Sequence, residues 1–164
     1  YKQEELSTRP QSIFPQEIAF NLIPAIGALG ENGNSEEEEK IKEETLKIFS
    51  LSNNKIPFMV TTVRVPTYRC HGLSVFLETN KPISSVKNIQ EELILAKSLQ
   101  YFEGKDLESL PTCRSFCQNN EVAVSRVRLE PASESRWVHY WSVGDNLRKG
   151  AASNAIQILE QLLF

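Results

Sequence analysis

Strand patterns that follow one another along the chain, with helical patterns between them, restrict the fold more than any other feature. β-Branched residues or alternating apolar residues indicate strands at residues 58–63, 71–79, 121–129 and 137–143. The third strand alternates imperfectly, as a strand with a bulge does. Helical periodicity begins near residues 35, 85 and 145. Neighbouring strands with interspersed helices predict an α+β fold: a mixed sheet with helices on one face.

Local signals set the limits of these elements. Pro15 and Pro24 exclude a continuous helix over residues 13–26. Ser35 is a good N-cap, and Glu38 three residues later completes the sequence pattern of a capping box. Asp145 is the predicted cap of the closing helix.

We expect three apolar helix faces, separated by an irregular stretch at residues 101–120. The faces comprise Ile41, Leu46, Ile48 and Phe49 in the first helix; Ile89, Leu93, Ala96 and Leu99 in the second; and Ala152, Ala155, Ile156, Leu159 and Leu162 or Leu163 in the third.

Composition excludes several classes of protein. The 164 residues are 40% apolar and 24% charged, which is typical of one globular domain. A net charge of −3 argues against a nucleic-acid surface, and no apolar run reaches the ~18–20 residues that span a bilayer. The first residues resemble no targeting signal. The chain begins at Tyr1 and not at Met, which agrees with a start within a longer protein or with removal of the first residues by processing.

The three cysteines, Cys70, Cys113 and Cys117, favour free thiols in a reducing cytosol. Cys113 and Cys117 lack a nearby second Cys/His pair, so we expect no metal site. Cys70 and His71 are neighbours on a strand and point to opposite faces, so we do not expect Cys70 to be a nucleophile.

The stretch from Val63 to Gly72 is the strongest candidate for chemistry. It places Arg64, Arg69 and His71 around Pro66 in a turn between strands. Arginine suits bidentate recognition of a carboxylate or phosphate, and histidine is the usual acid/base near neutral pH. The alternative is a surface turn with a locally bonded histidine.

Weaker candidates lie elsewhere. Glu37 and Lys40 are three residues apart on one helical face and could contact a zwitterionic or phosphorylated ligand, or form an ordinary surface ion pair. His139 shares a strand face with two tryptophans and favours a structural role. The small residues after Asp145 permit close packing against a ligand or another element, or simply follow a helix cap.

At these positions the chain resembles the aspartate-semialdehyde dehydrogenase family. The matching segments occur in the family's order and nearly span the chain: Phe14–Pro24, Glu43–Ile48, Val63–His71 and Gly144–Gln157. Residues 101–120 match poorly apart from Leu110-Pro111-Thr112, which leaves the local dimer-interface structure and the roles of Cys113 and Cys117 open.

The resemblance implies a specific organisation. The fold would be similar to the C-terminal domain of glyceraldehyde-3-phosphate dehydrogenase, with a mixed, largely antiparallel sheet. Residues 1–12 would end a segment of the nucleotide-binding half, residues 13–143 would form the substrate-binding and dimerisation domain, and residues 144–164 would form a helix packing on that half. The family's glycine-rich cofactor loop and Asn-Cys-Thr-like motif are absent from the sequence, so we expect the chain alone to be inactive.

Site roles also follow from the resemblance. Arg64 would grip the substrate α-carboxylate, His71 would act as acid/base, Glu37 would meet the substrate ammonium and Lys40 inorganic phosphate. Asn146 would lie near the nicotinamide of NADP.

The implied reaction is reductive dephosphorylation of β-aspartyl phosphate to the semialdehyde through a thioacyl intermediate. It belongs to the biosynthesis of lysine, threonine and methionine. The protein would be a cytoplasmic homodimer or homotetramer. The alternative is a catalytically silent paralogue that uses this domain for dimerisation or binding.

Overall fold

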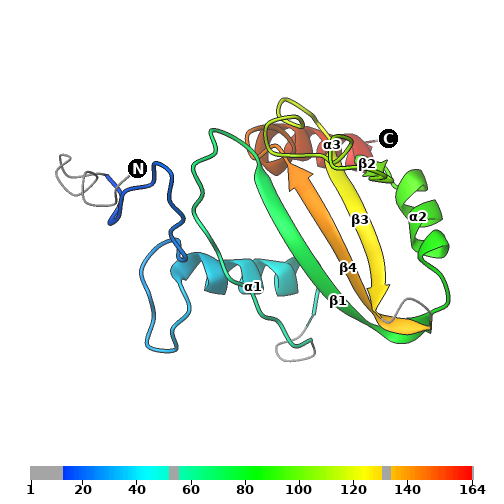
Figure 1. Ribbon diagram of the computed structural model, residues 1–164, viewed down its shortest axis with the longest axis horizontal. Helices are drawn as coiled ribbons and strands as arrows, with labels where there is room; N and C mark the ends of the chain where they lie inside the picture. The colour runs from blue at the N-terminus through cyan, green and yellow to red at the C-terminus, as the bar shows by residue number, and fades with distance from the viewer. Residues whose placement is uncertain (1–12, 52–55, 131–133, 164) are drawn as a thin grey trace. The chain divides into compact units, whose positions relative to one another are not determined.

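The chain forms two compact units, Tyr1–Pro66 and Thr67–Phe164. A computed structural model describes residues 13–51, 56–130 and 134–163 (Figure 1). The predicted terminal segment 1–12 lies outside the described residues.

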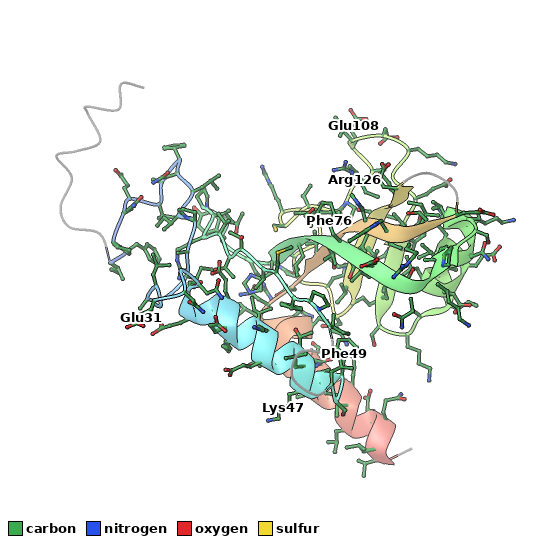
Figure 2. All side chains as sticks on the ribbon, turned by 90° about the horizontal axis from the view of Figure 1, so that it is seen from below. Glu31, Lys47, Phe49, Phe76, Glu108 and Arg126 are labelled. Atoms are coloured by element: carbon green, nitrogen blue, oxygen red, sulfur yellow. The ribbon has the colours of Figure 1, made fainter. Side chains whose placement is uncertain are left out.

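The first unit contains one helix, α1 (Glu36–Ile48), among its described residues. Its start confirms the prediction, because the capping box between Ser35 and Glu38 is present. The predicted inner face is only partly buried. Ile41 and Leu46 are half-buried, whereas Ile48 and Phe49, at the end of the helix (Figure 2), are exposed.

The strand expected at residues 58–63 is not formed, and this prediction is wrong. An isolated bridge between Ile23 and Arg64 takes its place, with reciprocal N–H···O distances of 3.0 and 2.8 Å. The backbone N–H of Thr62 donates to the side chain of Glu38 at 2.7 Å, so that donor is not available to a strand ladder. Pro66 follows shortly and cannot donate to one.

The second unit is built on one four-stranded sheet (Figure 1) with the order β1-β4-β3-β2. Its strands are β1 (His71–Ile83), β2 (Leu99–Phe102), β3 (Val122–Glu130) and β4 (Ser135–Gly144). The β1–β4 and β3–β4 pairs are antiparallel, and β2 runs parallel to β3. This topology confirms the predicted mixed, largely antiparallel sheet.

A bulge interrupts the β3–β4 ladder between Ser125 and Arg128, as the imperfect alternation predicted. Arg126 occupies it with a φ of 56°. Beyond the bulge, Arg128 lies opposite His139.

Helix α2 (Val86–Leu95) covers one face of the sheet. The side chain of Ser85 caps it by accepting the N–H of Lys87. Ile89 and Leu93 pack, as predicted, against a core that comprises Val124, Val127, Leu129 and Val138.

The predicted second helix was too long. It ends at Leu95, because Ala96 is already extended, with a ψ of 130°. Ala96 is therefore exposed and is not a core residue. Leu99 does reach the core, but from β2. Tyr101 and Phe102, predicted to be irregular, also belong to β2.

The opposite face of the sheet carries a second core made by Cys70, Phe116, Ala123 and Val143. Trp141 packs against this core and donates its indole N–H to the carbonyl of Pro111 at 3.0 Å. The loop between β2 and β3 contributes Cys113 and Cys117 to the same core. An irregular loop therefore covers part of the face that α2 does not.

The closing helix begins later than predicted. A π-helical turn, η2 (Arg148–Ala152), precedes α3 (Ser153–Leu163). Asp145 still accepts the N–H of Leu147 at 2.9 Å, but most of its carboxylate contacts go to other segments, which is why it does not cap α3. The predicted apolar face of α3 is exposed at Ile156, Leu159, Leu162 and Leu163. No helix among the described residues is long and apolar enough to cross a membrane.

Candidate functional site

The predicted site residues divide between the two units. Arg64, Glu37 and Lys40 belong to the first unit, whereas His71 and Asn146 belong to the second.

The backbone of Arg64 is fixed by its bridge to Ile23. The half-buried side chain places its guanidinium carbon 4.7 Å from the centre of the Phe14 ring. This is a cation–π contact, and the N–H donors of an arginine are the groups that recognise a carboxylate.

Glu37 and Lys40 form an ion pair of 3.8 Å on α1, with side chains that are 38% and 58% exposed. This is the surface pair that the alternative interpretation described, of the kind worth about 0.3–0.5 kcal/mol on a helix. Lys40 also lines an open hollow of about 410 Å³ with Asn34, Glu39 and Glu43. A ligand contact by either residue therefore remains a prediction.

A buried network at the start of α1 was not predicted in full. The carboxylate of Glu38 accepts the N–H of Ser35 and the N–H of Thr62, both at 2.7 Å. These backbone hydrogen bonds lower the pKa of Glu38. The bond from Ser35 has the larger effect, and the bond from Thr62 the next. The network ties the N-terminus of α1 to the segment that leads to Arg64. The capping-box spacing predicted only the contact between Glu38 and Ser35, not the contact between Glu38 and Thr62.

His71 is the first residue of β1 and lies opposite Gly144 in the antiparallel ladder. Its side chain is exposed. No hydrogen bond to its ring is formed within the part of the chain that the structure describes.

The residue before His71 is strained and buried. Cys70 has a φ of 73°, which costs a residue other than glycine about 1–3 kcal/mol. Its N–H donates to Oδ1 of Asn146 at 2.9 Å. The pKa of Cys70 is raised to about 11. Burial of the thiol is the largest cause, and the negative charge of Asp145 is the second. The thiol therefore stays protonated, in agreement with the expectation that Cys70 is no nucleophile.

Asp145 is fully buried and connects three segments. Its carboxylate accepts the Nε–H of Arg69 and the backbone N–H groups of Gln118 and Leu147, with N···O distances of 2.9, 2.6 and 2.9 Å. Burial alone would raise the pKa of Asp145. The hydrogen bond from Arg69 and those from the two N–H groups outweigh burial and lower the pKa below its usual range.

The sequence left open a ligand contact by Arg69, and the structure pairs this arginine with Asp145. The sequence singled out Asp145 only as a helix cap, and the separation of 76 residues between the partners hid their pairing.

His139 makes a packing contact of the kind that a structural histidine makes. Its ring lies 4.1 Å, centre to centre, from that of Phe76; Phe76 on β1 is labelled in Figure 2. The three cysteines are free thiols. No cluster of His, Cys, Asp and Glu that could hold a metal ion occurs among residues 13–51, 56–130 and 134–163.

Comparison with protein families places this geometry in context. Residues 2–149 match the family model described as "Semialdehyde dehydrogenase, dimerisation domain". The aspartate-semialdehyde dehydrogenase of Shewanella violacea is 38% identical over 152 residues, which cover 92% of this chain and 43% of that protein. That of Aquifex aeolicus is 37% identical over 150 residues, with the same coverage of 92% and 43%.

Solved structures agree with these relatives. The crystal structure of aspartate semialdehyde dehydrogenase II from Vibrio cholerae has a TM-score of 0.84 and 37% identity, and the match covers 98% of this chain and 47% of that one. The same enzyme complexed with ASA has a TM-score of 0.83 and 37% identity, with 94% and 44% covered. This chain thus spans less than half the length of the proteins it matches.

Proposed function

We propose a function on the premise that this chain belongs to the semialdehyde dehydrogenase family, in which it represents the dimerisation domain. The complete protein is an NADP-dependent aspartate-semialdehyde dehydrogenase that converts β-aspartyl phosphate to aspartate semialdehyde. The chain forms its substrate-binding half. The observation that carries this proposal is the 37–39% identity to several aspartate-semialdehyde dehydrogenases over 92% of the chain.

The site residues are assigned as follows. Arg64 holds the substrate carboxylate. A guanidinium suits bidentate recognition of a carboxylate, and the contact with Phe14 gives this side chain a defined place. His71 transfers protons, and its exposure at a strand end supports this role. Glu37 binds the ammonium group of the substrate, and Lys40 binds inorganic phosphate. Binding of either ligand group would have to break their present ion pair, which is weak enough to allow it.

Asn146 is compatible with a place beside a nicotinamide. Its Oδ1 is occupied by the N–H of Cys70, which fixes the carboxamide and leaves the two Nδ2 hydrogens as the donors it can offer. NADPH would supply the hydride when bound. The glycine-rich loop expected for most of the cofactor is absent from this sequence, so the rest of NADP would bind elsewhere in the complete protein.

The domain also serves self-association. The family description as a dimerisation domain supports a homodimer or homotetramer, and the exposed Phe76 and Trp137 on one sheet face support an apolar contact. Sedimentation at tens of micromolar, the range where weak interfaces are populated, should show dimers or tetramers. Only monomers would contradict this part of the proposal. We place the protein in the cytoplasm, in the synthesis of lysine, threonine and methionine.

The activity is tested on the complete protein. Aspartate semialdehyde, NADP and inorganic phosphate should together produce NADPH, and omission of phosphate should abolish the signal. Replacement of NADP by NAD measures cofactor preference. The 164-residue chain alone should be inactive. A complete protein that binds the substrate without turnover would support the silent paralogue and overturn the enzyme.

A further inference from the structure

A two-residue clamp holds the turn that precedes His71. We propose that Asp145 and Asn146 are positioning residues, which hold Arg69 and Cys70 and thereby set the place of His71 for proton transfer. The inference rests on the proposed function, because it assigns His71 the acid/base role. Both clamp residues and the turn lie within the second unit.

The first contact acts on the backbone next to His71. Asn146 accepts the N–H of Cys70 at 2.9 Å through Oδ1. Cys70 has the positive φ of 73° that sets the direction in which the chain enters β1. A residue other than glycine keeps such a conformation only where its surroundings enforce it. The hydrogen bond that Cys70 donates to Asn146 and the burial of Cys70, which is 5% exposed, provide that enforcement.

The second contact acts one residue earlier. Nε of Arg69 lies 2.9 and 2.8 Å from the two carboxylate oxygens of Asp145, whose side chain is fully buried. The same carboxylate accepts the N–H of Gln118 at 2.6 Å. Gln118 immediately follows Cys117, which packs against the core cluster that contains Cys70. Asp145 therefore fixes the turn and also the loop that encloses the Cys70 thiol.

The clamp and the strand pairing meet at His71. His71 lies opposite Gly144, the residue directly before Asp145. The end of β4 thus holds His71 through its backbone pairing with Gly144. It holds Arg69 and Cys70 through the side chains of Asp145 and Asn146. No described residue forms a hydrogen bond with the His71 ring. The backbone at residues 69–71 therefore determines the position from which the His71 side chain extends. A shift of about 1 Å in a reacting group can cost about 100-fold in rate.

A double-mutant cycle in the complete enzyme tests the clamp. Asp145→Asn removes the charge that holds Arg69 and keeps the shape of the side chain. We expect it to lower kcat about 10- to 100-fold with less than about a threefold change in KM. In a His71→Ala background the same substitution should change kcat less than about twofold, because no imidazole remains to be misplaced. An equal loss in both backgrounds would overturn the proposal.

Asp106→Asn is the matched control, since Asp106 is the only other aspartate of the chain and also accepts a backbone N–H, that of Ser109 at 2.8 Å. It lies in an exposed loop and should leave kcat within about twofold. If Asp145→Asn does not fold, Arg69→Lys replaces it. Lysine keeps the charge but lacks the planar fork, so we expect about a tenfold loss that likewise disappears in the His71→Ala background.

A structural measurement separates this proposal from the proposed function. Crystal structures of the complete wild-type protein and of Asp145→Asn, or of Arg69→Lys if Asp145→Asn does not fold, should differ at Cys70 and His71 and agree at His139. An unchanged His71 would overturn the clamp, even if the enzyme is active. A wild-type protein without dehydrogenase activity would overturn the proposed function, while a displaced His71 would still support the clamp.

Discussion

Arg69 and Asp145 form an ion pair across 76 residues of sequence, with Nε of the guanidinium within 3 Å of both carboxylate oxygens. Asp145 is fully buried, and the Arg69 side chain is 28% exposed. The pair closes the second unit by joining the turn before β1 to the end of β4. The stability of this unit should therefore depend on the charge of one carboxylate.

The first prediction concerns acid. Because the folded state lowers the pKa of Asp145, its stabilisation is complete above the ordinary aspartate pKa of about 3.9 and is lost as the pH falls through the lower folded value. Asp145→Asn should reduce the free energy of unfolding by about 1–3 kcal/mol near neutral pH. The difference from wild type should shrink below about pH 4.

Urea unfolding of the chain at several pH values, followed by fluorescence of Trp137 and Trp141, measures this effect. Asp106→Asn, on an exposed loop, is the control and should follow the wild-type curve. A constant difference between Asp145→Asn and wild type from neutral to acid pH would contradict the assignment.

The second prediction concerns the close approach of Gly72 to Trp141. A Cβ on Gly72 would lie 2.6 and 2.8 Å from two ring carbons of Trp141. The ring cannot simply move, because its N–H is bonded to the carbonyl of Pro111. Gly72→Ala should therefore destabilise the chain by about 1–3 kcal/mol, the usual cost of overpacking.

Gly144→Ala is the matched control, since Gly144 lies on the adjacent strand and its nearest neighbour would be Val122 at an ordinary 3.8 Å. Thermal unfolding of the two variants should show a lower Tm for Gly72→Ala alone. Equal Tm values would mean that Trp141 can shift without cost.

The third prediction separates binding from chemistry at Arg64. Arg64→Lys keeps the charge but loses the planar fork that matches a carboxylate. In the complete enzyme it should raise KM and also lower kcat, because even ~1 Å of misplacement of the reacting carbon can cost ~100-fold. Steady-state kinetics with aspartate semialdehyde measures both constants. Unchanged kinetics would contradict a substrate-binding role for Arg64, and its contact with Phe14 would then be structural.

The fourth prediction concerns His71. His71→Ala should lower kcat by roughly 100- to 10,000-fold with little change in KM, the usual share of general acid/base catalysis. His71→Gln keeps a hydrogen-bond donor but cannot titrate, so it should recover only part of the loss. The pH–rate profile should lose one limb in both variants. His139→Gln is the control, because His139 packs on Phe76 and should keep the wild-type profile. An intact kcat in His71→Ala, with weaker substrate binding, would make His71 a binding residue.

Local patterns were sufficient where neighbours in sequence determine the structure. The capping box at Ser35 and Glu38 and the strand that begins at His71 each depend on residues a few positions apart. The bulge in β3 was also visible, because an extra residue in one strand shifts the side chains that follow it to the opposite face and breaks the alternation of period two. The mixed sheet followed from the order of these elements.

Contacts between residues far apart in the sequence determined the elements that local patterns did not predict. Residues 58–63 have strand composition, yet the N–H of Thr62 is taken by a carboxylate 24 residues earlier. Leu99 has helical spacing, yet it lies in β2, because the parallel pairing with β3 supplies its hydrogen bonds. Strand formation needs a neighbour, and sequence periodicity does not identify one.

The sequence by itself determined the fold class, the elements and the residue types that could carry chemistry, since these depend on local propensity and on family motifs. Only the tertiary structure showed which arginine of the Val63–Gly72 stretch pairs with a carboxylate of the chain itself. Arg69 neutralises the buried carboxylate of Asp145, whereas the guanidinium of Arg64 lies over the ring of Phe14. The physical reason is that a buried charge must be paired, and its partner is chosen by proximity in the folded chain.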